Sequence, residues 1–79
     1  MKKEEFFIQF HEFLEIQSTP AFDENTDIKA LDEYDSLMVM AIIAFIDEHF
    51  STRLTATQLN NIITVKDLMI LVGYHKFSE

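Results

Sequence analysis

The chain has 79 residues, 48% of them hydrophobic, and its 14 acidic and 6 basic side chains give a formal net charge of -8. A chain of this length forms one domain, over residues 1–79, and its charge repels nucleic-acid phosphates and anionic membrane surfaces. The absence of cysteine excludes disulfides, thiolate metal sites and a cysteine nucleophile. The longest apolar run, residues 37–46, is about half the length of a membrane-spanning helix. We therefore expect a soluble, cytoplasmic monomer without nucleic-acid or membrane partners.

The first element in chain order is an amphipathic helix over residues 1–16. Its aromatic side chains recur at helical spacing while glutamates occupy the other faces, a pattern typical of a helix with one buried stripe. The stripe consists of Phe6, Phe7, Phe10, Phe13 and Leu14. With one glycine and one proline in the whole chain, a turn-rich β architecture is disfavoured and an all-α fold is expected.

A long loop is expected from residue 17 to residue 34, where the helical pattern lapses and polar residues dominate. Phe22, Ile28 and Leu31 are its expected apolar anchors. Within it, Asp23, Asn25 and Asp27 have the spacing that opens a calcium-binding loop. The required glycine and glutamate are missing further along, so a calcium site is not expected.

The second helix is predicted to span residues 36–50, with Asp35 as its N-cap. Its predicted buried stripe consists of Val39, Ile42, Ile43, Ile46 and Phe50. The side chains left nearer the outside are Leu37, Met38, Ala41, Ala44, Phe45 and Glu48. An exterior this apolar predicts a partner surface. The alternative is that a small core uses both faces of the helix, with Met40 and Phe45 turned inward against the loop.

Two further helices are predicted from their caps. Thr55 and Gln58 have the form of a capping box and predict a short helix that ends near Asn60. Thr64 is expected to cap a last helix that stops at Gly73, after which the chain trails off. The predicted fold is therefore a four-helix bundle with a short third helix and a long loop between helices one and two.

The tripeptide Asp35-Ser36-Leu37 carries the main functional signal. Ser36 has no glycine-rich nucleophile turn, and the three histidines of the chain lie in separate elements, so hydrolysis is not expected. No recognised metal-ligand spacing is present. A serine in the first turn of a helix can accept a phosphate-linked group, because the helix dipole and the free N–H groups favour an anion there. On the tripeptide alone, a simple supporting role in the helix cap is the alternative.

The chain as a whole resembles the acyl carrier protein family. The resemblance rests on its length, its acidity, the amphipathic first helix, the long loop, Leu31, Asp35-Ser36-Leu37, Asp47-Glu48-x-Phe50 and Thr64-Val65-x-Asp67-Leu68. It implies that Ser36 carries 4′-phosphopantetheine, added from coenzyme A by a separate phosphopantetheinyl transferase. The thiol of that arm then holds acyl groups as thioesters for acyl-loading and acyl-using enzymes, and the chain itself is not an enzyme. The lack of cysteine agrees, since the working thiol belongs to the cofactor.

Departures from the family pattern indicate a variant, stand-alone carrier. Glu33 replaces a usual glycine, Tyr34 directly precedes Asp35, and Met38 and Ala41 replace acidic side chains. Partner docking is therefore expected to depend mainly on apolar side chains, with some electrostatic steering. The apolar docking residues are Leu37, Met38, Ala41 and Phe45, and the acidic ones are Asp35, Asp47 and Glu48.

The resemblance leaves three questions open. The cargo belongs to fatty acid or specialised acyl or polyketide-type biosynthesis, or the chain is an aminoacyl or peptidyl carrier. A four-helix interaction module that is never modified is the alternative from another class. Family members can shelter an acyl chain between their helices, but bulky phenylalanines also fit that space here.

Overall fold

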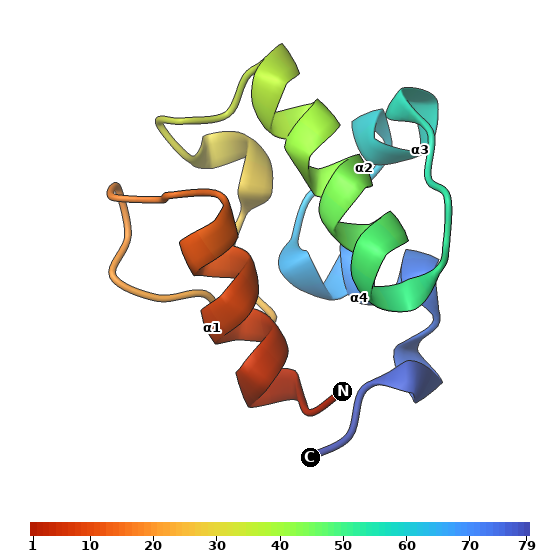
Figure 1. Ribbon diagram of the computed structural model, residues 1–79. Coiled ribbons are helices and arrows are strands. Elements are labelled where there is room, and N and C mark those ends of the chain that lie inside the picture. The colour runs from red at the N-terminus through yellow and green to blue at the C-terminus, as the bar shows by residue number, and fades with distance from the viewer.

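The computed structural model describes residues 1–79 and contains four α-helices and no sheet (Figure 1). The elements are α1 (Lys3–Phe13), η1 (Ile28–Ala30), α2 (Ser36–Phe50), α3 (Ala56–Asn60), α4 (Val65–Val72) and η2 (Tyr74–Lys76), where η marks a 3-10 turn. The all-α bundle, the short third helix and the long first loop confirm the predicted fold class. In Figure 1 both termini lie at one end of the bundle, and the start of α2 lies at the other. No helix has the length and apolar character needed to cross a membrane.

The later helices begin and end where their capping residues predict. Thr55 Oγ1 accepts a hydrogen bond from Gln58 N at 3.1 Å, and Thr64 Oγ1 accepts one from Asp67 N at 3.2 Å, so both capping boxes are formed. Gly73 ends α4 with φ of 124°, in the left-handed half of backbone space that favours glycine. Helix α1 is shorter than predicted, because the chain leaves the helix at Leu14 and Glu15 takes φ of 54°.

The core is built around phenylalanine rings. The Phe45 ring on α2 lies 6.0 Å from the Phe6 ring and 5.1 Å from the Phe10 ring, centroid to centroid, and both partners belong to α1. Phe77 extends the cluster, with its ring 4.9 Å from that of Phe6. Tilted and edge-on pairs at these separations stabilise a core beyond the burial of their area.

The buried face of α2 differs from the predicted one. Met38 and Phe45, predicted nearer the outside, are 5% and 1% exposed, so that prediction is wrong. The alternative that Phe45 turns inward is confirmed, but Met40 is 63% exposed and does not. The fully buried side chains of α2 are Met38, Ile42, Phe45 and Ile46. Val39, Ile43 and Phe50 are only partly buried. The helix is apolar on nearly all sides, so its pattern does not fix its rotation, and the packing of Phe45 against α1 does.

The first loop is held by its predicted anchors and by one carboxylate. Phe22 and Ile28 are buried, and Leu31 packs against the core. The Glu33 carboxylate accepts hydrogen bonds from the Ser18 hydroxyl at 2.6 Å, the Gln17 N–H at 2.8 Å and the Ser18 N–H at 3.1 Å. Glu33 thus ties the end of the loop to its beginning, immediately before α2.

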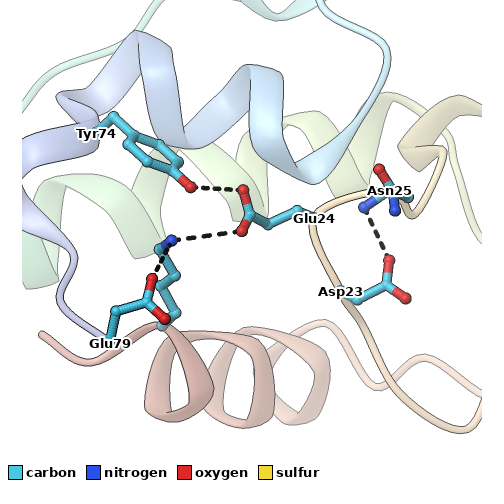
Figure 2. Close-up of polar contacts among 6 residues, drawn as sticks. Asp23, Glu24, Asn25, Tyr74 and Glu79 are labelled. Atoms are coloured by element: carbon cyan, nitrogen blue, oxygen red, sulfur yellow. Dashed lines mark hydrogen bonds and ion pairs between the residues drawn. The ribbon is translucent and has the colours of Figure 1, made fainter.

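A polar cluster connects the chain ends to the first loop, as Figure 2 shows. Lys3 Nζ lies 2.8 Å from Glu79 Oε1 and 3.5 Å from Glu24 Oε2, and the Tyr74 hydroxyl donates to Glu24 Oε1 at 2.6 Å. The hydrogen bond from Tyr74 lowers the pKa of the Glu24 carboxyl. The expectation that the chain trails off after Gly73 is therefore wrong, because η2 and the buried Phe77 pack onto the bundle.

The loop with calcium-like spacing uses its polar groups internally. Asp23 Oδ1 accepts a hydrogen bond from Asn25 N at 2.8 Å, a contact drawn in Figure 2. Asp27 Oδ1 accepts from Ala30 N at 3.1 Å and so caps η1. Both carboxylates therefore serve turns of the loop itself.

Replacement of Phe45 by alanine tests whether this ring holds α1 and α2 together. We expect Phe45→Ala to destabilise the fold by about 3–5 kcal/mol, because a large buried ring leaves a cavity. That is a large part of the free energy of unfolding of a domain this small, so thermal unfolding should start near room temperature. Phe13→Ala is the matched control, since Phe13 also contacts Phe45 but is 45% exposed. Equal losses of Tm in the two variants would contradict the assignment.

The Glu33 contacts predict a pH dependence of stability. The Ser18 hydroxyl and the Gln17 N–H favour the charged carboxylate and lower the pKa of Glu33 from 4.5 to about 2. A lowered pKa in the folded state means that the stabilisation is complete above the unfolded-state value and is lost as the pH falls towards 2. An NMR titration of the Glu33 carboxyl should therefore give a midpoint well below the ordinary value.

Glu33→Gln should lower Tm at neutral pH, and its Tm should fall less between neutral and acid pH than that of the wild type. Asp32→Asn, at the exposed neighbour, should show neither change. If the Tm of Glu33→Gln fell as steeply in acid as that of the wild type, this role of Glu33 would be contradicted.

Candidate functional site

Ser36 is the first residue of α2 and is exposed to solvent. The cap of the helix is made by its neighbour: Asp35 is extended, and its Oδ1 accepts a hydrogen bond from Met38 N at 2.8 Å. The predicted N-cap role of Asp35 is therefore confirmed. Because Asp35 caps the helix, the Ser36 hydroxyl is free for another use.

The structure brings no general base to Ser36. In the structure, no hydrogen bond joins the Ser36 hydroxyl to a histidine or a carboxylate. His11 is hydrogen-bonded through Nε2 to the Thr19 carbonyl at 2.7 Å, and the His49 ring packs 4.2 Å from the Phe45 ring. His75 lies in η2, at the chain terminus. A serine with no base within hydrogen-bond reach is not activated as a nucleophile by this chain, and its hydroxyl can receive a group from another enzyme.

The start of α2 fits a phosphodiester. The first N–H groups of a helix have no partner within the helix, and a dipole along fifteen residues is positive at this end. The cap from Asp35 uses the N–H of Met38 alone, which leaves the N–H groups of Ser36 and Leu37 for an anion. Ser36 is exposed, and the start of α2 lies at the far end of the bundle from both termini (Figure 1), so the chain ends lie away from this residue.

An exposed apolar ridge runs along α2 from the serine. Leu37 is 79% exposed and Met40 is 63% exposed, with Ala44 also exposed and Ala41 half-buried. These four residues are called the α2 ridge below. Met38 and Phe45 do not belong to it, because both side chains point into the core. Met40 was missed as a surface residue, although its spacing of three from Leu37 places it on the same side.

A shallow groove borders the ridge on the side of α1. It has a free volume of about 230 Å³, and Ser36 lies between two of its lining residues in the chain. The groove is lined by Phe13, Leu14, Glu15, Glu33, Asp35, Leu37, Met38 and Ala41. Three of these are carboxylates, so the groove combines an apolar floor with an acidic rim.

The two acidic residues predicted near the other end of α2 are both exposed. Asp47 Oδ2 lies 3.9 Å from Arg53 Nη2, and both side chains are at the surface, so this ion pair is weak. Glu48 makes no ion pair in the structure. These carboxylates lie three turns from Ser36, well apart from the acidic rim of the groove.

The comparison with known families agrees with this geometry. The sequence profile of the phosphopantetheine attachment site family matches residues 9–72, from within α1 to the end of α4. Neither a curated protein nor a solved structure matches the chain. The family match covers most of the chain and all of the elements that surround the start of α2. The chain therefore belongs to the phosphopantetheine attachment site family, whose domains hold 4′-phosphopantetheine covalently and act in general as non-catalytic carriers.

Proposed function

We propose that the chain is an acyl carrier protein in which Ser36 is the attachment residue. The arm holds acyl groups as thioesters and presents them to partner enzymes of fatty acid or specialised acyl biosynthesis, in the cytoplasm. One observation carries the assignment of Ser36: its hydroxyl is exposed at the positive end of α2 while Asp35 makes the cap. An aminoacyl or peptidyl carrier is the second candidate, because the same attachment geometry serves either cargo.

The modification requires only a nucleophilic oxygen from this chain. In the transfer, Ser36 Oγ forms a bond to the phosphorus that bears the pantetheine, and the phosphoanhydride bond of coenzyme A breaks. Adenosine 3′,5′-bisphosphate leaves, and the serine proton goes to a base of the transferase. The chain contributes the exposed hydroxyl, and the two free N–H groups of the first turn of α2 stabilise the phosphodiester charge.

The α2 ridge is the proposed docking surface for the transferase and for later partners. Leu37, Met40 and Ala41 lie within two turns of Ser36, so a partner that reaches the serine also covers them. Asp35, Asp47 and Glu48 are exposed and are proposed to orient a partner with basic side chains. Because the centre of the surface is apolar, its contribution to affinity depends little on salt.

The attachment residue is tested by intact mass after coexpression with a broad-specificity phosphopantetheinyl transferase. The wild-type chain should gain the mass of one phosphopantetheine group, and Ser36→Ala should gain none, because no other hydroxyl lies at the start of a long helix. Ser78→Ala, at an exposed serine near the chain end, is the control and should be modified like the wild type. An unmodified wild-type chain would favour the interaction module, and an equal gain in Ser36→Ala would show that another residue is modified.

The docking surface is tested with the kinetics of the same transferase. We expect Met40→Gln to lower kcat/KM about tenfold, which corresponds to about 1.4 kcal/mol, because it removes an apolar contact beside the serine. Ile70→Gln is the matched control, since Ile70 on α4 is 56% exposed and Met40 is 63% exposed. Wild-type kcat/KM should also change little from low to moderate ionic strength. A steep fall with salt, or equal losses in both variants, would argue for docking by charge elsewhere.

A further inference from the structure

A narrow apolar crevice lies beside the first turns of α2, and it shares no lining residue with the groove. It is lined by Ile28, Tyr34, Val39, Ile42, Leu59 and Ile62, with Lys29 at its edge. Tyr34 precedes Ser36 by two residues and Val39 follows it by three, so the crevice opens next to the attachment residue. It is the nearest apolar interior that a group on Ser36 could enter.

The crevice has almost no free volume, because its lining side chains fill it. Its free volume is about 10 Å³, at or below the roughly 10–15 Å³ that a single water molecule needs. A cavity of about 150 Å³ is known to bind benzene, so an aliphatic chain has no room in a space this small. Tyr34 supplies the largest side chain of the lining, and it is partly buried against the core between η1, α2 and α3.

Hydrogen bonds from one side chain and from the backbone hold the walls of the crevice together. Lys29 Nζ donates a hydrogen bond to the Asn60 carbonyl, which joins η1 to the end of α3. Beside it, Ile28 N donates to the Ile63 carbonyl at 2.9 Å and Val65 N donates to the Thr26 carbonyl at 3.0 Å. These bonds resist the separation of η1 from α3 that a wider crevice would need.

The larger space beside Ser36 is the shallow groove on the side of α1, and it is open to solvent. The region between α1 and α2 is filled by the rings of Phe6, Phe10 and Phe45, which are all 1% exposed or less. A group attached to Ser36 therefore finds a filled core, the solvent-open groove or the open surface.

We propose that Tyr34 is a specificity-determining residue that keeps the cargo of this carrier outside the bundle. This inference rests on the proposed attachment of the arm to Ser36. An aliphatic chain held at the surface keeps its methylene groups in water, which becomes more unfavourable with each added carbon. The cargo that suits such a carrier is short or polar, and removal of the Tyr34 ring should create an internal slot for longer chains.

The test compares acetyl and octanoyl forms of the wild-type chain, Tyr34→Ala and Tyr34→Phe. Each form is loaded from acetyl-CoA or octanoyl-CoA by the transferase and checked by mass. Two quantities are measured within each variant: the difference in Tm between octanoyl and acetyl forms, and the ratio of their thioester hydrolysis rates at mildly alkaline pH. Comparison within a variant removes any general loss of stability that the substitution causes.

For the wild type and Tyr34→Phe, we expect equal Tm values and similar hydrolysis rates for the two cargoes. For Tyr34→Ala, we expect the octanoyl form to melt several degrees above the acetyl form and to hydrolyse several-fold more slowly. An octanoyl group that stabilises and protects the wild type would overturn the proposal, as would the absence of any gain in Tyr34→Ala. Failure of all forms to load would instead contradict the attachment at Ser36.

Discussion

The packing of Phe45 against Phe6 and Phe10 sets the rotation of α2, and the surface around Ser36 follows from it. Successive helical residues differ by about 100° in direction, so once Phe45 points at α1, Met38 must also point inward. The same rotation turns Leu37 and Met40 to solvent, with exposed fractions of 79% and 63%. The ring contacts of the core therefore decide which side chains a partner enzyme can touch.

The helix boundaries could be predicted because their signals are local. Thr55 and Thr64 each bond to the N–H three residues ahead, and the residue types that do so are visible in the sequence. Asp35 caps α2 by the same kind of contact, which places Ser36 at the first position of the helix. The position of Ser36 at the start of a helix could thus be predicted from the adjacent residues, whereas its role was inferred from the resemblance of the whole chain to a family.

The features that could not be predicted from the sequence depend on contacts between distant residues. An all-round apolar helix carries no periodic signal for its rotation, so Met38 and Phe45 were placed on the wrong side. The terminal residues looked like a loose tail, yet the Tyr74 hydroxyl bonds to Glu24, fifty residues away. Glu33 looked like a substitution at a glycine position, and its bonds to Gln17 and Ser18 become visible only when the loop is closed.

Each of the three residues before Ser36 fixes this segment to a different part of the fold. Glu33 binds the start of the first loop, Tyr34 fills the crevice against α3, and Asp35 caps α2. A segment fixed at each position loses little conformational entropy when a partner docks on it, so more of the contact energy remains as affinity. If a glycine replaced Glu33 and a small residue replaced Tyr34, Ser36 would follow a less constrained segment. The bulky residues that depart from the family pattern therefore hold Ser36 on a rigid segment, and under the proposal above the same packing keeps cargo out of the interior.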